Sequence, residues 1–296
     1  MLLLVPLLAT VIYITRVYSS LLIELDDNET SLTSNEIFPR NLHDAASSGS
    51  FQKVKLLIAG GSDIHQRNGA DFTPLMLACE KGYYFSAAEL IRAGSDINFH
   101  DSRGVAAITL AVTGNFTEIV GALLNADANP NTTDSVGMTV TMLASKKNLH
   151  LILKLLIGKG SDFDHQTSTG NSAIHFASIA GNFQSVSVLL DAGSDAELRL
   201  TSGHTALMLA ASRGHSTIVS MLIEYGVHID DRDGIGMSAL DHAIYRGQQS
   251  SMRLLAAAGA EMSHAGISMD EETQSKRAVN IWKKTHPHQL HPSEEL

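Results

Sequence analysis

The chain has 296 residues, of which 44% are hydrophobic and 18% charged, and a formal net charge of −10 at pH 7. The negative charge disfavours a nucleic acid as the main partner, because binding its backbone requires a net basic surface that displaces counterions. The single cysteine, Cys79, excludes a disulfide within the chain, so the fold must depend on packing.

Residues 1–23 are predicted to form a signal peptide or a membrane anchor. From Leu2 onward an almost uninterrupted apolar run extends over thirteen residues. Such a run is short for a membrane span, which needs about 20 residues, and suits the core of a signal peptide. An apolar segment that continues to Ile23, with Arg16 inside it, is long enough to span a membrane, and the positive-inside rule then leaves the rest of the chain in the cytosol. Residues 24–33 are a polar linker in either case.

Residues 34–264 repeat with a strict period of 33 residues and without an insertion in seven copies. Alanine holds the same place in every copy, and leucine follows each alanine after twelve residues. The seven alanines are Ala45, Ala78, Ala111, Ala144, Ala177, Ala210 and Ala243. The period divides the segment into units at residues 34–66, 67–99, 100–132, 133–165, 166–198, 199–231 and 232–264. Apolar residues recur at spacings of three and four within the units, which predicts two short helices in each.

Each predicted helix ends at a residue that tolerates a left-handed backbone. The first helix of a unit ends at glycine or asparagine, and the second ends at glycine, except for Asp127 in the third unit. Neither helix is long enough to be stable alone, so adjacent units must stack to bury their apolar faces. The small alanine then marks the place where neighbouring helices approach closely.

The repeat resembles the ankyrin-repeat family. The segment Thr73-Pro74-Leu75-Met76-Leu77-Ala78 is similar to the family signature Thr-Pro-Leu-His-x-Ala, and Gly94-Ser95-Asp96-Ile97-Asn98 is similar to its Gly-Ala-Asp-Val-Asn ending. The resemblance implies an all-α ankyrin-repeat solenoid of about seven 33-residue helix-turn-helix units joined by hairpin-like loops. It also implies that Cys79, next to Ala78, is a buried structural thiol.

Departures from the family signature predict that units three and four, residues 100–165, are the least stable part of the array. The signature histidine, which ties the start of a helix to the adjoining loop, is kept only at His43 and His175. In the fourth unit, Thr141 replaces the aliphatic residue that the other units carry three residues before the alanine. Fewer ties are expected to leave the central loops looser.

The resemblance implies that a protein partner binds the concave face, which the loop tips and the exposed side of the first helices form. Carrying these positions over gives the candidate partner-binding residues Phe72, Arg103, Val105, Val136, Met138, Arg199, His204, Arg232, Ile235, Met237 and Tyr245. The apolar members have no preference for a solvated loop, so they indicate either an interaction surface or side chains that fold back onto the neighbouring loop. Arginine and tyrosine are enriched among binding hot spots. This singles out the C-terminal set Arg199, His204, Arg232 and Tyr245.

Motifs for catalysis are absent from the sequence. It holds no strand-bounded glycine loop, no nucleophile elbow and no paired zinc-ligand spacing, so we expect no enzyme, no cofactor and no metal site. The tail histidines His286, His288 and His291 offer metal ligands, but a polar tail without a rigid surrounding shell is the preferred interpretation.

Residues 265–296 are predicted to be a helix followed by a polar tail. The helix is expected over residues 270–284, either shielding the last repeat or solvated. The final segment Ser293-Glu294-Glu295-Leu296 is similar to a loose form of the Lys-Asp-Glu-Leu retention signal. Together with a signal-like start it favours the secretory pathway, with the endoplasmic-reticulum lumen as the compartment. The alternative is a membrane-anchored chain with the repeats in the cytoplasm.

These patterns predict a non-catalytic interaction scaffold that binds a protein partner on the concave face of the solenoid. The alternative is a structural spacer or membrane tether without a specific ligand on that face. No nucleic acid is expected as a partner, and residues 2–23 are the segment that would associate with a membrane.

Overall fold

The computed structural model describes residues 41–262, which consist of helices and connecting loops. Among them there is no strand, only two isolated bridges at the bases of loops, His100 with Ala106 and Thr133 with Thr139. No helix in this part of the chain is long and apolar enough to cross a membrane.

Several sequence predictions concern residues outside this range. The signal peptide or anchor at residues 1–23, the linker at residues 24–33, and the helix and tail at residues 265–296 lie outside the described residues. The compartment that was inferred from these segments therefore stays a prediction.

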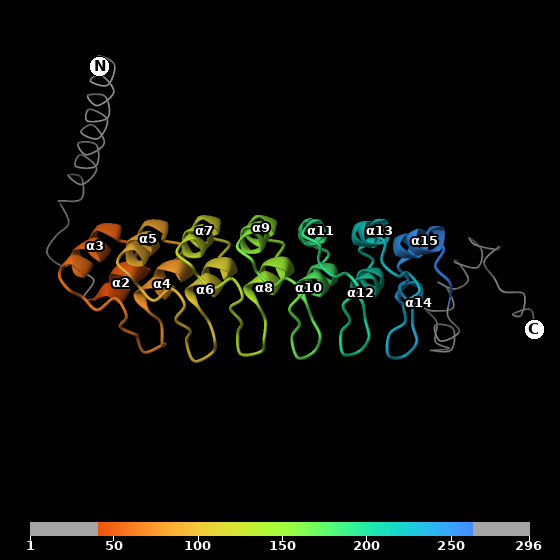
Figure 1. Cartoon of the computed structure of the whole chain (residues 1–296), viewed down its shortest axis with the longest axis horizontal. Coiled ribbons are helices and arrows are strands. Elements are labelled where there is room, and N and C mark those ends of the chain that lie inside the picture. The colour runs from red at the N-terminus through yellow and green to blue at the C-terminus, as the bar shows by residue number, and fades with distance from the viewer. Residues whose placement is uncertain (1–40, 263–296) are drawn as a thin grey trace, which may run out of the picture. The chain divides into compact units, whose positions relative to one another are not determined.

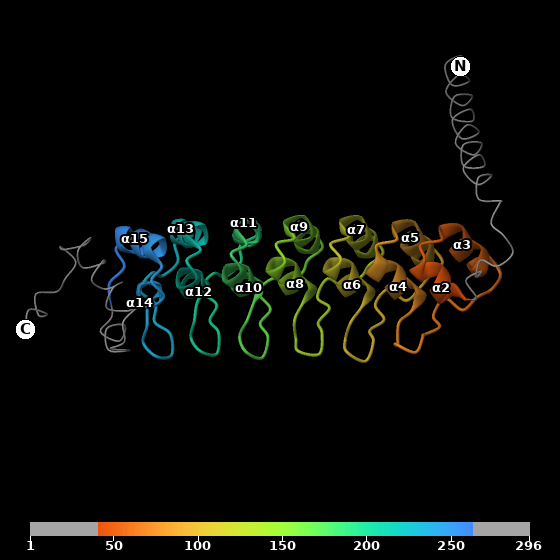
Figure 2. The same ribbon diagram turned by 180° about the vertical axis from the view of Figure 1, so that it is seen from behind.

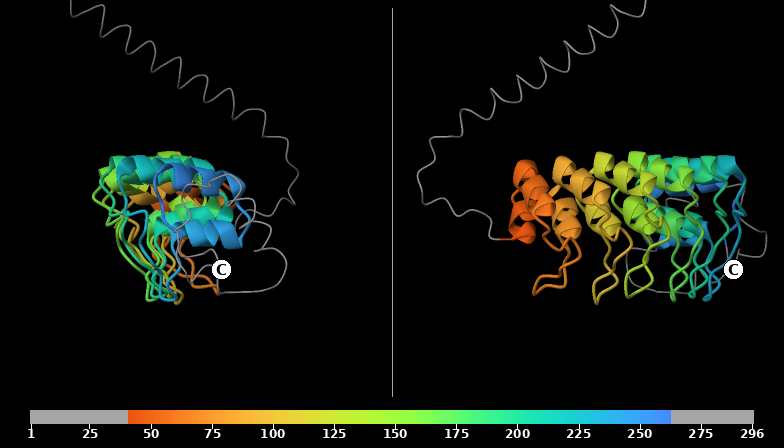
Figure 3. Two further views of the ribbon diagram at one scale, coloured as in Figure 1. Left: turned by 90° about the vertical axis from the view of Figure 1, so that its right-hand side faces the viewer. Right: turned by 60° about the vertical axis from the view of Figure 1, so that its left-hand side comes forward.

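Seven helix pairs follow one another along residues 41–262, each with an inner and an outer helix. The inner helices are α2 (Leu42–Ser47), α4 (Pro74–Lys81), α6 (Ala107–Thr113), α8 (Val140–Lys146), α10 (Ala173–Ala180), α12 (Ala206–Arg213) and α14 (Ala239–Tyr245). The outer helices are α3 (Phe51–Ala59), α5 (Tyr84–Arg92), α7 (Thr117–Asn125), α9 (His150–Gly158), α11 (Phe183–Asp191), α13 (Ser216–Tyr225) and α15 (Gln249–Ala257). The two sets form two rows, and the hairpin-like loops all leave the row of inner helices on the same side (Figures 1 and 2). Figure 3 shows the same two layers from other directions, with the loops extending away from them. This arrangement confirms the all-α solenoid.

The alanine period marks the contact between neighbouring units. All seven alanines lie in inner helices and are completely buried. Each inner helix contacts the next inner helix, and each outer helix contacts the next outer helix. The small side chain lets the inner helices approach closely. Six of the seven leucines that follow twelve residues later are completely buried in the outer layer, and Leu57 of the first unit is half-buried. Cys79, next to Ala78, is buried as expected, and burial raises the pKa of its thiol.

The predicted turn residues adopt the left-handed backbone. Those that end the inner helices have φ between 58° and 79°, and those that end the outer helices have φ between 63° and 97°. Three of them are not glycine, namely Asn115, Asp127 and Asn148, and all three lie in units three and four. Because this conformation strains residues that carry a Cβ atom, these two units hold backbone strain at the ends of their helices, where the other units have glycine.

Two histidines tie a helix start to the adjoining loop, as predicted. Nε2 of His175 lies 2.9 Å from the carbonyl oxygen of Leu198, and its Nδ1 lies 2.9 Å from Oγ of Ser172 at the start of α10. In the first unit, Nε2 of His43 lies 2.9 Å from the carbonyl oxygen of Gln66. Each histidine therefore joins a helix to a loop more than twenty residues further along the chain.

A further set of hydrogen bonds joins successive units from the second to the seventh. In five successive units a side-chain oxygen accepts from the backbone N–H group 31 residues later, at distances between 2.7 and 3.2 Å. The acceptors are Asn98, Asn131, Asp164, Glu197 and Asp230. These bonds hold the loops at a constant spacing along the stack.

Unit three lacks a side-chain cap on its inner helix, and unit four buries a hydroxyl group at a position where the other units have an aliphatic residue. Helix α6 begins after Ala106, whose side chain offers no cap to the helix. In α8, Oγ1 of Thr141 is completely buried and has no hydrogen-bond partner among the described residues. A buried hydroxyl group without a partner costs about 1–3 kcal/mol.

We predict that residues 100–165 exchange their amide hydrogens faster than residues 166–231. The strained turns, the missing cap at α6 and the buried hydroxyl of Thr141 all reduce the free energy needed to open this segment. Hydrogen exchange followed by mass spectrometry is expected to show about tenfold lower protection there, equivalent to about 1.4 kcal/mol. Equal protection of the two segments contradicts this prediction.

Replacing Thr141 by valine is expected to stabilise the protein. The change Thr141→Val keeps the shape of the side chain and removes the unpartnered hydroxyl, so the free energy of unfolding rises by about 1 kcal/mol. The matched control is Thr139→Val, two residues earlier, because Oγ1 of Thr139 accepts the N–H group of Met142 at 3.1 Å. Loss of this cap lowers the free energy of unfolding by about 1 kcal/mol. Urea unfolding of both variants checks the opposite signs, and two changes of the same sign refute the assignment.

Stability is expected to fall below pH 6.5 because of His175. Burial lowers the pKa of His175 to about 4, although its hydrogen bond to Leu198 acts in the opposite direction. The unfolded chain therefore binds a proton between pH 6.5 and 4 that the folded chain does not, and stability decreases as the pH falls through this window. Between pH 7.5 and 5 the loss amounts to about 2 kcal/mol.

The variant His175→Met, which copies Met208 of the next unit, isolates this effect. Urea unfolding at pH 7.5, 6 and 5 should show a weaker pH dependence in the variant than in the unmodified protein. The same pH dependence in both proteins would exclude His175 as the cause.

Candidate partner-binding surface

A single side-chain oxygen builds each of several hairpin-like loops. Oδ1 of Asp134 accepts hydrogen bonds from the N–H groups of Val136 at 3.0 Å and Met138 at 2.9 Å. Oδ1 of Asn68, of Asp101 and of Asp233 likewise accepts the N–H groups of the residues two and four positions later. Side-chain oxygens of Asn and Asp stabilise turns in this way. In these loops the second residue after the acceptor lies at the tip, and the fourth residue lies next to the inner helix.

Three candidate residues lie at the tips and are exposed. Val136 is 66% and Ile235 is 57% exposed, and Arg103 is exposed at the same position of the third unit. Large apolar side chains in solvent at well-defined loops are typical of interaction surfaces. The structure thus places these three candidates where a partner can reach them.

Four apolar candidates point inward instead. Phe72 is 8% and Met237 is 3% exposed, and Val105 and Met138 are half-buried. Their backbone N–H groups donate the second of the two hydrogen bonds to the side-chain oxygen of the loop. This bond places their side chains beside the inner helix. The expectation of exposed side chains at Phe72 and Met237 is therefore wrong, and the fold-back alternative describes both residues.

Two candidate arginines bond to the protein itself. Nη2 of Arg103 lies 2.7 Å from Oδ2 of Asp101. Burial raises the pKa of Asp101, but hydrogen bonds from the backbone and from Arg103 outweigh it, so this pKa lies below its ordinary value. Nη1 of Arg199 donates to the carbonyl oxygen of Arg232 at 2.9 Å, and its guanidinium group also pairs with Asp231. Arg199 therefore ties two adjacent loops together.

The last unit supplies two further exposed candidates. Tyr245, at the end of α14, is 40% exposed, and the guanidinium carbon of Arg246 lies 5.6 Å from its ring centre. Arg232 is exposed and makes one long hydrogen bond, 3.4 Å, to the carbonyl oxygen of Gly236. Together with Ile235, these residues give the seventh unit an aromatic, an aliphatic and two cationic side chains in solvent.

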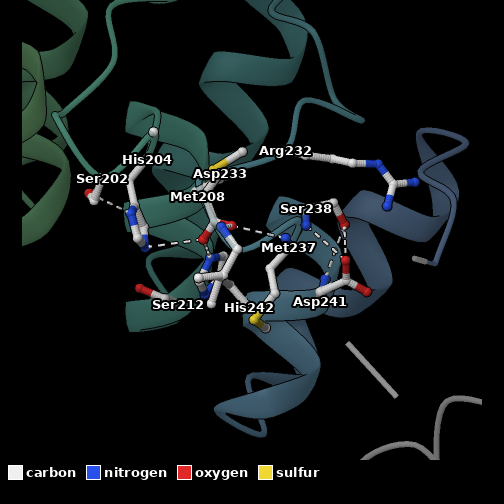
Figure 4. Close-up of polar contacts among 12 residues, drawn as sticks. Ser202, His204, Met208, Ser212, Arg232, Asp233, Met237, Ser238, Asp241 and His242 are labelled. Atoms are coloured by element: carbon white, nitrogen blue, oxygen red, sulfur yellow. Dashed lines mark hydrogen bonds and ion pairs between the residues drawn. The ribbon is translucent and has the colours of Figure 1, made fainter. Parts of the chain in front are cut away.

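His204 belongs to a polar cluster between two units, which Figure 4 shows. Its Nδ1 lies 2.8 Å from Oγ of Ser202, and its Nε2 lies 3.5 Å from Oδ2 of Asp233. Nε2 of His242 lies 2.8 Å from the same oxygen. The sequence analysis did not identify Asp233 or His242. At the position of His242 four other units have leucine, and this difference marks the residue as unusual.

Sequence reasoning also missed an aromatic cluster on the outer helices. Phe85 of α5 is 70% exposed, with ring centres 5.5 Å from Tyr84 and 6.2 Å from Phe51 of α3. Most other units have a polar residue at the position of Phe85, for example Gln52 and Glu118. An aromatic residue there could have indicated this cluster from the sequence. This cluster lies on the layer of outer helices and not on the loops.

Comparison with known proteins agrees with the architecture. The family model "Ankyrin repeats (3 copies)" matches residues 42–134, 118–199, 141–233 and 188–265. The crystal structure of the human ASB11 ankyrin repeat domain has a TM-score of 0.67 with this chain at 23% sequence identity, and the match covers 75% of this chain and 99% of that domain.

Two curated relatives match over a short segment. Protein phosphatase 1 regulatory subunit 27 is 55% identical in Homo sapiens and 52% identical in Mus musculus, in each case over 42 residues. The match covers 14% of this chain and 27% of each relative, so this chain spans about a quarter of the length of those proteins.

Ankyrin repeats are in general non-catalytic modules that mediate contacts between proteins. The matched segments overlap, together cover residues 42–265, and contain all of the helix pairs described above. The chain belongs to the ankyrin-repeat family.

Proposed function

We propose that this chain is a non-catalytic scaffold that binds a protein partner across its loop-side surface. We define this surface by the exposed residues Arg103, Val136, Arg232, Ile235 and Tyr245. The observation that carries the proposal is the exposure of two large apolar side chains, Val136 and Ile235, at the same loop position three units apart.

The loops that carry these side chains are held in one conformation before any partner binds. Oδ1 of Asp134 and of Asp233 each accept two backbone hydrogen bonds, and the ladder of bonds between units fixes the spacing of the loops. A partner therefore orders little backbone when it binds, which lowers the entropic cost of association.

The exposed groups also indicate the chemistry of the partner. Ile235 and Tyr245 offer apolar and aromatic contact area, while Arg232 and Arg246 are exposed cations in the same unit. Aromatic and arginine side chains supply much of the energy at protein interfaces, and complementary charge selects the partner. A segment that presents apolar side chains beside carboxylate groups fits this end of the surface.

A structural spacer or membrane tether is the rival function. Buried side chains at Phe72 and Met237 and the bond between loops made by Arg199 are expected in a spacer as well as in a binding protein. Exposed apolar side chains at Val136 and Ile235 are expected only in a binding protein. The match to a phosphatase regulatory subunit extends over little more than one unit, so it supports the class of interaction module and does not identify the partner.

The variant Val136→Glu/Ile235→Glu/Tyr245→Ala is expected to lose its partner. Loss of these contacts should reduce the partner recovered with the full chain at least about tenfold, equivalent to about 1.4 kcal/mol. The measurement is chemical cross-linking in cells that express the tagged chain, followed by quantitative mass spectrometry of the copurified proteins.

The matched control is Leu56→Glu/Leu151→Glu, because these outer-helix side chains are as exposed, at 71% and 58%. The control should recover the partner at the level of the unmodified chain, and thermal melting should show all three proteins equally folded. A spacer predicts the same recovered proteins from all three chains, and that result would exclude the proposed function.

A further inference from the structure

Three side chains from two adjacent units converge on one point near the C-terminal end of the described residues. His204 comes from the loop before α12, Asp233 from the loop before α14, and His242 from α14 itself. Oδ2 of Asp233 lies 2.8 Å from Nε2 of His242 and 3.5 Å from Nε2 of His204. The three ligand atoms all lie within 4.8 Å of one another, and Figure 4 shows both rings turned toward the carboxylate.

Stacking of the repeats does not require these two histidines. The position of His242 is occupied by Asp44, Leu77, Leu110, Leu143, Phe176 and Leu209 in the preceding units. From the second unit onward, the position of His204 is occupied in the other units by Phe72, Val105, Met138, Asn171 and Met237. Both histidines therefore replace residues with which the same fold forms elsewhere in this chain, so another reason for their presence is needed.

Only one carboxylate oxygen of Asp233 takes part in the loop, and the other is available to the histidines. Its Oδ1 accepts the N–H groups of Ile235 and Met237 and so builds the loop, as Oδ1 of Asp101 does in the third unit. Its Oδ2 takes no part in the loop and faces the two rings. The side chain of Asp233 is completely buried, so this oxygen contacts the histidines rather than bulk solvent.

The second nitrogen of His204 has a hydrogen-bond partner that orients the ring. Nδ1 lies 2.8 Å from Oγ of Ser202, which leaves Nε2 directed at Asp233. Histidines that bind metal ions commonly use the other ring nitrogen in this way.

We propose that His204, Asp233 and His242 form a zinc-binding site that joins the sixth and seventh units. Zinc binds histidine nitrogen and carboxylate oxygen at about 2.0–2.2 Å, so ligand atoms around one ion lie up to about 4 Å apart. The 3.5 Å between Oδ2 of Asp233 and Nε2 of His204 fits this geometry, and the 2.8 Å to Nε2 of His242 is a hydrogen bond that must lengthen for both atoms to bind one ion. Three protein ligands leave a fourth position for water or for a group of a binding partner.

The second group of potential ligands in the described residues has a different character. Glu197, His228 and Asp231 also lie close together, but His228 is exposed and Asp231 pairs with the guanidinium group of Arg199. A bound cation there would have to displace that arginine. His228 therefore provides a matched control for the proposed site.

The test is a zinc titration of the purified full chain in mild detergent, after treatment with a chelator. The parent protein carries His286→Gln/His288→Gln/His291→Gln, so that the tail histidines do not bind the ion. Three variants each introduce a residue that another unit has at the same position: His204→Asn as in Asn171, Asp233→Asn as in Asn68, and His242→Leu as in Leu209. The control variant is His228→Ala.

We expect the parent to bind one zinc ion by calorimetry and to melt at a higher temperature when zinc is present. Each of the three variants should lose at least tenfold in zinc affinity and show no thermal shift, whereas His228→Ala should match the parent. With Co²⁺ as the probe, the parent and His228→Ala should show visible absorption bands that the other variants lack.

Melting curves without metal show whether the variants fold, and the borrowed residues make folding the expected result. Absence of zinc binding in the parent overturns the proposal. Unchanged affinity in His204→Asn, Asp233→Asn or His242→Leu also overturns it, as does loss of binding in His228→Ala.

Discussion

The contact between neighbouring inner helices at the buried alanines is the interaction on which the rest of this array depends. Helices of six to ten residues are too short to be stable alone in water, so each unit is helical because its neighbours cover its apolar face. The contact recurs every 33 residues, and it therefore places the loops in register as well as the helices. Val136 and Ile235 hold equivalent places on the surface because of this register.

The sequence predicted this scaffold well because each of its signals occurs several times. The buried alanines, the leucines of the outer layer and the left-handed turns all lie where the period places them. Single departures were also informative, since Thr141 proved to be a buried hydroxyl without a partner. Where one residue type recurs in the same frame, chance is a poor explanation, and packing is the common physical cause.

The direction of individual loop side chains was much harder to predict. Ile235 and Met237 are both apolar and only two residues apart, yet one is exposed and the other is buried. Their difference arises from the two hydrogen bonds that Oδ1 of Asp233 accepts, which hydrophobicity does not encode. The meeting of His204 with His242 was hidden for another reason, because residues 38 positions apart become neighbours only when adjacent units stack.

The loop aspartates show how such an array can gain chemistry without changing its fold. One carboxylate oxygen accepts the two backbone hydrogen bonds of the loop, and the other can bond to a side chain of the same or the neighbouring unit. In the third unit the second oxygen of Asp101 pairs with Arg103, and in the seventh unit that of Asp233 faces two histidines. Substitutions around the second oxygen leave both loop hydrogen bonds in place, so the surface of each unit can vary independently of the stacking contacts. A uniform backbone period is therefore compatible with a different chemical character at each loop, and the exposed apolar tips and the histidine cluster are two results of this freedom.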